Sequence, residues 1–165
     1  MRLLAAVETR PEDELQKTLS IGQGTLWRSL THMFAAEWVW LATLGGDEKP
    51  VLPGDRPDAL PGNQEADGGF KSLAELRSAW EELNDRWREY LNNLQDAQLD
   101  ETIYKVSSLQ KTRMATRCSD ILLHVCTHAH YTTAQVVNML RQVGAPSLPD
   151  PMLITMARQD AAEKT

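Results

Sequence analysis

Three long stretches of helical periodicity constrain the fold of this chain more than any other feature. They cover residues 25–44, 72–94 and 119–143, and in each of them apolar residues recur every three or four positions. The first stretch is apolar on most of its circumference, which is typical of a largely buried helix. These three stretches predict a mostly helical protein.

Residues typical of helix ends bound the three stretches. Gly45-Gly46 and Gly144 stand where a glycine commonly ends a helix. Ser72 and Glu75 have the spacing of a capping box, in which a serine and a glutamate satisfy the first N–H groups of a helix. The boundaries therefore agree with the periodicity.

Shorter signals complete the expected architecture. Residues 2–8 and 150–161 predict short helices, and the β-branched residues in 102–115 indicate a short hairpin with a turn near 108–111. We expect one domain over residues 1–165, an all-α antiparallel four-helix bundle with a shortened first helix. A second subunit that covers the groove beside the short helix would explain its length, so we expect a homodimer.

Residues 45–71 separate the first two long helices and are rich in glycine, proline and acidic residues. We expect one long irregular loop there, since such composition disfavours regular structure. Its acidic residues are expected to form a solvated surface: Asp55, Asp58, Glu65 and Asp67.

Composition excludes several classes of function. Seventeen Lys and Arg against 23 Asp and Glu give a net charge of −6, and the cations are scattered, which disfavours a nucleic acid partner. No apolar run is long enough to span a membrane. Cys118 and Cys126 would lie about 12 Å apart on one helix, too far for a disulfide, and we interpret both as small buried apolar residues. Free cysteines and no recognisable export signal indicate the cytoplasm.

Three of the four histidines have spacings that suit a metal site. His124 and His128 are four residues apart and share one face of the last long helix. His32, on the first long helix, could supply a third imidazole, and three nitrogen ligands leave a position open for water or substrate. His130 lies about 200° around the helix from His128 and is expected to face elsewhere.

Less specific interpretations of these residues remain open. His124, His128, Thr132 and Gln135 could form a buried polar seam whose side chains hydrogen-bond one another and backbone carbonyls. Glu37 could pair with an arginine at the edge of its helix, which is the interpretation we favour. Alternatively, its carboxylate could accept the N–H of a metal-binding imidazole and so orient that ring.

Two segments resemble the signature helices of the DinB-like superfamily. They read SLTHMFAAEWVWL at 29–41 and DILLHVCTHAHYTTAQVVNMLRQVG at 120–144, and the loop and helix between them have the same order and spacing. The resemblance covers the chain from about residue 12 onward. It implies that most of the family's first helix would lie upstream of Met1.

The resemblance implies a function as well as a fold. Members of this family are four-helix bundles, commonly homodimers, in which three histidines gather a divalent metal, often nickel or zinc. Several are transferases that use a low-molecular-weight thiol such as bacillithiol, mycothiol or glutathione. By this resemblance His32 matches the first ligand and His128 the second, whereas Thr132 stands at the position of the third. Gln135 of the family pattern is kept.

A threonine hydroxyl is a poor ligand for nickel or zinc, so three outcomes follow for this site. His124 could replace the missing ligand, water could complete a two-histidine site, or metal binding could be lost. The first two predict a metal-dependent transferase that acts with a small thiol on a small electrophile. The third predicts a non-catalytic, stress-related bundle whose degenerate site binds a small ligand or a protein partner.

Overall fold

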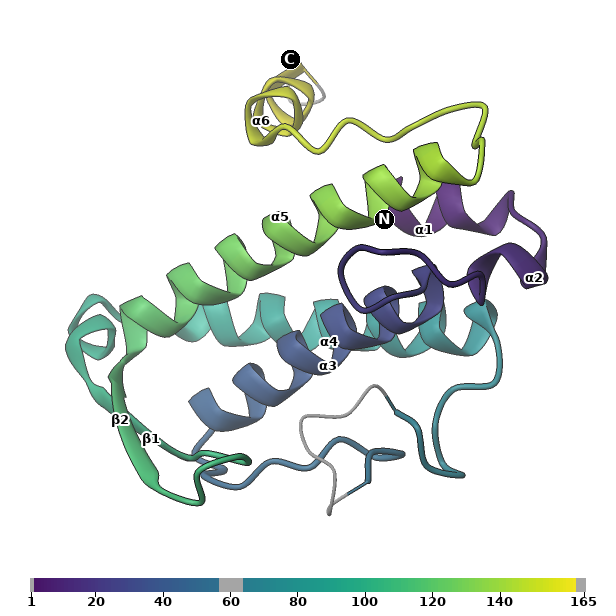
Figure 1. Ribbon diagram of the computed structural model, residues 1–165. Coiled ribbons are helices and arrows are strands. Elements are labelled where there is room, and N and C mark those ends of the chain that lie inside the picture. Colours follow the sequence, from purple (N-terminus) through teal and green to yellow (C-terminus); the bar gives the residue numbers. More distant parts are fainter. Residues whose placement is uncertain (1, 57–63, 163–165) are drawn as a thin grey trace.

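The computed structural model describes residues 2–56 and 64–162, and it is mostly helical with one small two-stranded sheet (Figure 1). Three long helices match the three periodic stretches to within a residue or two at each end: α3 (Leu26–Leu44), α4 (Leu73–Asn93) and α5 (Cys118–Gln142). The shorter elements are α1 (Arg2–Glu8), α2 (Glu12–Leu15), the 3-10 helix η1 (Asp96–Asp100) and α6 (Leu153–Ala162). The expected helical class is confirmed.

Side chains cap the starts of two long helices. The Thr25 hydroxyl accepts a hydrogen bond from the Arg28 N–H at 3.0 Å, and the Ser72 hydroxyl accepts one from the Glu75 N–H at 3.2 Å. The Glu75 carboxylate reaches back to the N–H of Lys71 at 2.8 Å. The predicted capping box is therefore shifted by one residue in its second hydrogen bond, but both of its side chains satisfy N–H groups at the start of α4.

The main core lies where α3 packs against α4 and α5, and α1 contacts both α4 and α5 at one end (Figure 1). Leucines and other apolar residues fill this core with almost no exposure, among them Leu26, Leu30, Leu76, Leu83, Val136, Met139 and Leu140. The helical spacing of Leu91 from Leu83 and Trp87 predicts that it points inward as they do, but Leu91 is 51% exposed. It lies near the end of α4, where Tyr90 and Leu94 pack against a second, small core cluster but the Leu91 side chain does not. α6 lies on the far side of α5 from α3 (Figure 1).

A two-stranded antiparallel hairpin precedes α5, as the β-branched segment predicts. Strand β1 (Thr102–Val106) pairs with β2 (Arg113–Arg117), and Thr102 lies opposite Arg117. The Val106 N–H donates to the Glu48 carbonyl at 2.7 Å, and Arg113 pairs with the Glu48 carboxylate. These contacts fix the hairpin against the loop that follows α3.

The loop between α3 and α4 is more embedded than its composition predicts. Leu52 is 2% exposed, and Asp55, at 9%, accepts a hydrogen bond from the Gln64 N–H at 2.7 Å. The expectation of a solvated acidic surface is therefore wrong for Asp55, because the hydrogen bond from the Gln64 N–H compensates its burial. Glu65 and Asp67 are exposed as expected, and Asp58 lies outside the described residues.

The two cysteines differ in their surroundings. Both are free; Cys118 is buried at 1% exposure, as expected, and its sulfur lies 3.6 Å from the Tyr90 hydroxyl. Cys126 is exposed on α5, so the expectation that it is buried is wrong. Cys126 is the ninth residue of α5, and its place along the helix does not by itself determine whether another element covers it.

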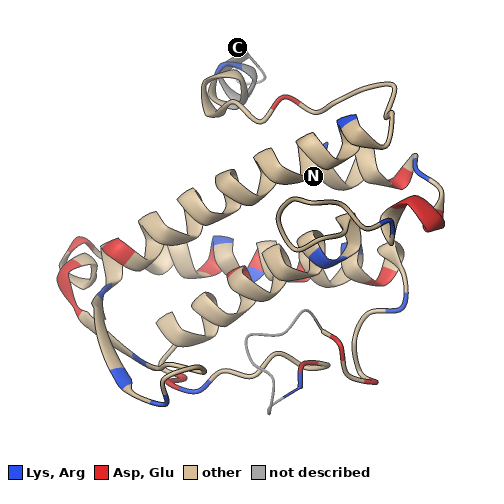
Figure 2. Ribbon diagram, viewed as in Figure 1, with Lys and Arg blue, Asp and Glu red and all other residues tan. Residues whose placement is uncertain are grey.

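Charged residues are sparse on α3 and α5 (Figure 2). α3 carries Arg28 near its start and Glu37 at its middle, whereas α5 carries Asp120 and Arg141 near its two ends. Even so, none of the helices in the described ranges combines the length and the apolar character needed to cross a membrane. Glu37 is thus an isolated charge in the middle of a largely apolar helix.

Candidate functional site

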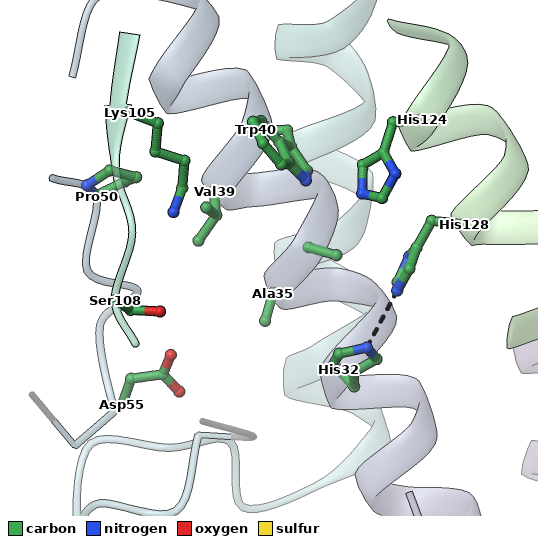
Figure 3. A pocket seen from close by; sticks show the side chains of 11 residues that line it. His32, Ala35, Val39, Trp40, Pro50, Asp55, Lys105, Ser108, His124 and His128 are labelled. Atoms are coloured by element: carbon green, nitrogen blue, oxygen red, sulfur yellow. Dashed lines mark hydrogen bonds between the residues drawn. The ribbon is translucent and has the colours of Figure 1, made fainter. Parts of the chain in front are cut away.

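A cavity of about 230 Å³ lies between α3, α5, the hairpin and the loop after α3 (Figure 3). Its polar lining brings together side chains from all four elements: His32, His124, His128, Lys105, Ser108 and Asp55. The small side chains of Ala35 and Ala36 lie one turn beyond His32 on the same face of α3 and leave room for the space. The three histidines that the sequence singles out by their spacing therefore line one cavity.

His32 and His128 meet at the edge of this cavity. Their Nε2 atoms lie 3.1 Å apart, and the ring planes are inclined by 60° (Figure 3). At that distance two unprotonated nitrogens would direct their lone pairs at each other. Either one ring donates its proton to the other, or both nitrogens share a cation. The arrangement thus places two imidazole nitrogens, one from α3 and one from α5, next to each other.

Burial keeps both imidazoles of this pair neutral near pH 7. It lowers the pKa of His32 below the ordinary 6.5. The pKa of His128 is lowered first by burial and then by the nearby charges that His32 and His124 would carry when protonated. Neutral imidazole is the form that binds a metal ion or accepts a proton, so the pair is in its reactive form at neutral pH.

His124 lies beside the pair but does not converge with it. Its ring is 5.7 Å from the His128 ring and 5.4 Å from Trp40, which it contacts edge to face. His124 is exposed, whereas His32 and His128 are half-buried. In the described ranges no group of three or more His, Cys, Asp or Glu side chains has the arrangement of a metal site. The structure therefore brings the three predicted histidines into one cavity, with two of them in direct contact.

The predicted seam along α5 does not form through hydrogen bonds between its side chains, and its first member, His124, is exposed. No hydrogen bond joins any two of its four side chains, which all lie in the described part of the chain, and the partner of His128 is His32 on the facing helix. Thr132 is 2% exposed and sits in the core. Gln135 packs on Gly22, whose φ of +55° and lack of a side chain permit the approach, since a Cβ there would lie 2.7 Å from the Gln135 Oε1.

Two charged groups of the cavity, Lys105 and Asp55, were not predicted to lie there. Lys105, on β1, places its Nζ 5.7 Å from the centre of the Trp40 ring, and burial lowers its pKa (Figure 3). Asp55 lies on the opposite side of the cavity from the histidines (Figure 3). Its pKa is raised, mainly by burial and further by the charge of Glu65, and the hydrogen bond from the Gln64 N–H partly opposes that increase. Neither was predictable, because the hairpin and the loop reach the cavity only through long-range packing.

Glu37 fits neither of its two expected roles. Its Oε2 accepts a hydrogen bond from the Trp80 indole at 2.7 Å, so its partner is a tryptophan of α4, not an arginine or an imidazole. Glu37 and His130 both line a different cavity. The expectation that His130 faces away from the other histidines is confirmed.

A comparison with known protein families matches most of the chain. The family model of the DinB superfamily matches residues 1–136. The chain belongs to the DinB superfamily. The match begins earlier than residue 12, where the resemblance was expected to start, and it ends within α5, after both residues of the histidine pair. No curated protein matches the chain.

Proposed function

We propose that this DinB-superfamily protein is a metal-dependent transferase that acts with a low-molecular-weight thiol on a small electrophile. The observation that carries the proposal is the 3.1 Å approach of the His32 and His128 Nε2 atoms at the edge of a cavity. Nickel or zinc is the metal we propose. His124, in the same cavity, is the proposed third ligand.

The donor set fits such an ion. Imidazole nitrogen binds zinc at about 2.0–2.1 Å, so two nitrogens held 3.1 Å apart are close enough to reach one ion together. Both rings are neutral at pH 7, as ligation requires. Thr132 is buried in the core, so its hydroxyl takes no part in the proposal. A site with two or three protein ligands keeps positions open for a substrate.

A bound divalent metal would supply a lowered pKa for a coordinated thiol. The chain supplies position and charge. Lys105 and the Trp40 ring lie together on the wall of the cavity, where an ammonium group favours the negative charge of a thiolate or of a carboxylate on the thiol. In the reaction the thiol loses its proton to solvent, the sulfur forms a bond to the electrophilic carbon, and the leaving group departs with the electron pair of its old bond.

Metal binding tests the first part of the proposal. Titration of protein without a histidine tag with Zn²⁺ and with Ni²⁺ in a calorimeter should give one site per chain. His128→Ala should weaken that site by at least tenfold, whereas His130→Ala, a histidine two residues away in the second cavity, should leave it unchanged. Absence of binding, with thermal stability unchanged by either ion, would overturn the proposal.

Thiol transfer tests the second part. Glutathione and 1-chloro-2,4-dinitrobenzene provide a small thiol and a small electrophile whose product absorbs light. The zinc-loaded or nickel-loaded protein should release chloride from this electrophile faster than buffer alone does. Bacillithiol and mycothiol are the next thiols to assay. A metal-loaded protein with no transfer activity toward any of the three thiols would refute the enzyme while leaving the metal site intact.

A second candidate function follows from the position of His124. Because this ring packs on Trp40 and the described residues hold no converged set of three ligands, the cavity could serve a non-catalytic, stress-related protein that binds a small ligand or a protein partner. His32 and His128 would then be structural hydrogen-bonding partners. In that case His32→Ala lowers the melting temperature and removes no activity. A folded His32→Ala protein that has lost only thiol transfer would exclude this alternative.

The finer architecture and surroundings are also proposals. We propose an antiparallel four-helix bundle in which α1 is the short helix, and a homodimer in the cytoplasm without nucleic acid or membrane partners. Leu123 and Tyr131 support the dimer, because they are 63% and 65% exposed on the weakly charged helix α5 (Figure 2). Light scattering with size-exclusion chromatography measures the mass, and a monomer at micromolar concentration would contradict the dimer.

A further inference from the structure

A second and larger cavity, of about 430 Å³, shares no lining residue with the histidine cavity. It lies between α1, α3, α4, α5 and the segment 149–153, where the short helix α1 fills only part of the groove between α4 and α5. Most of its lining is apolar, including Leu3, Leu4, Met33, Ala129, Pro149 and Leu153. A cavity of this size and character suits a small organic ligand.

Glu37 is an unusual member of this apolar lining. Its hydrogen bond from Trp80 occupies Oε2, and within the described part of the chain Glu37 makes no other hydrogen bond and no ion pair with Lys or Arg. The second oxygen is thus available to a donor inside the cavity. Since a carboxylate removed from water without a cation is costly, its position calls for a partner.

The other charged and titratable groups of the cavity do not supply that partner. They come from three elements: Arg2 on α1, Cys126 and His130 on α5, and Asp150 in the segment after it. The pKa of Asp150 is lowered mainly by hydrogen bonds from Met152 and Thr155 and further by the positive charge of Arg2, so Arg2 and Asp150 attract each other. Glu37 is left as the unmatched charge.

We propose that this second cavity binds a small apolar amine, whose ammonium group donates to Glu37 while its hydrocarbon part contacts the apolar wall. The inference goes beyond the proposed transferase and does not depend on it. An apolar body with a single cationic end matches the lining, which offers one unpaired carboxylate and mostly hydrocarbon surface. The indole of Trp80 lines the same cavity and holds the Glu37 carboxylate in place through its N–H.

The protonation behaviour of Glu37 agrees with this ligand class. Burial raises the pKa of Glu37 to about 7, and the Trp80 hydrogen bond partly opposes that increase. An empty cavity therefore holds a carboxyl group that is about half ionised at neutral pH. A bound ammonium ion stabilises the ionised form, so the amine and the carboxylate favour each other's charged state.

Binding of 2-phenylethylamine at pH 8, measured by calorimetry, tests the proposal against its uncharged analogue 2-phenylethanol. The wild-type protein should bind the amine at least fivefold more tightly than the alcohol. Glu37→Gln should weaken amine binding at least fivefold, whereas Glu89→Gln, which removes the same charge from the exposed surface of α4, should not. No amine binding at millimolar concentration, equal binding of the alcohol, or a loss below fivefold in Glu37→Gln would each overturn it.

A second measurement locates the bound amine. The Trp80 indole N–H resonance in a ¹H–¹⁵N NMR spectrum should shift on titration with 2-phenylethylamine, because that N–H donates to Glu37. Ala129→Leu, which places extra volume in the cavity wall, should abolish the shift, and His128→Ala should preserve it. A shift that survives Ala129→Leu but disappears in His128→Ala would place the amine in the histidine cavity and overturn the proposal. Loss of metal binding in His128→Ala with amine binding intact separates the two sites.

Discussion

Replacing Glu37 by glutamine should stabilise the protein, by an amount that depends on pH. Burial moves the pKa of Glu37 from 4.5 to about 7, so the folded protein binds a proton more tightly than the unfolded chain between these values. The folded state is therefore favoured fully below pH 4.5, and this contribution is lost as the pH rises toward 7. At 1.36 kcal/mol per pKa unit the loss is about 3 kcal/mol at pH 8.

Glutamine keeps an oxygen that can accept the Trp80 hydrogen bond but carries no charge, so Glu37→Gln avoids the loss. Urea unfolding of both proteins should give nearly equal free energies of unfolding near pH 4.5 and a difference of up to about 3 kcal/mol in favour of the variant at pH 8. Glu89→Gln controls for the change in net charge. A variant that is equally stable or less stable at pH 8 would refute the reasoning, because Glu37 would then have a cationic or polar partner in the folded protein.

Two further predictions concern the histidine cavity, and a third concerns the loop beside it. Because the pKa values of His32 and His128 are lowered in the folded protein, their contribution to stability is present above pH 6.5 and is lost as the pH falls below it. His128→Gln should therefore reduce the change in the free energy of unfolding between pH 7 and pH 5.5, measured by urea unfolding. Lys105→Gln should reduce kcat/KM for glutathione about fivefold, the effect of about 1 kcal/mol, with an unchanged Zn²⁺ affinity in calorimetry. Gly54→Ala should lower stability by about 1–3 kcal/mol in thermal unfolding, because φ is +90° and a Cβ would lie 2.6 Å from the Gly68 backbone; an unchanged melting temperature would contradict that geometry.

Local signals in the sequence determined most of the secondary structure. The three long helices begin after Thr25, Ser72 and Arg117, close to where periodicity and capping place them, and the β-branched run forms the predicted hairpin. These features depend on neighbours within a few residues, which a single sequence displays directly. Leu91 and Cys126 were placed wrongly, because exposure near a helix end or beside a short helix depends on what packs there.

The site was predictable only in part, for the same physical reason. Helical spacing put His124 and His128 on one face, but it could not show that His128 would face His32 or that His124 would turn to Trp40. Lys105 and Asp55 reach the cavity from the hairpin and the loop, through contacts such as those of Glu48 with Val106 and Arg113. Long-range packing of this kind leaves no periodic trace in the sequence.

The proposed role of the histidine pair is tested most directly by anomalous diffraction from crystals of the protein grown with Zn²⁺, with data collected on both sides of the zinc absorption edge. We expect a single strong anomalous peak within bonding distance of the Nε2 atoms of both His32 and His128. Crystals that contain zinc elsewhere, or none, while the two nitrogens remain 3.1 Å apart as a hydrogen-bonded pair, would contradict the metal site and favour the non-catalytic alternative.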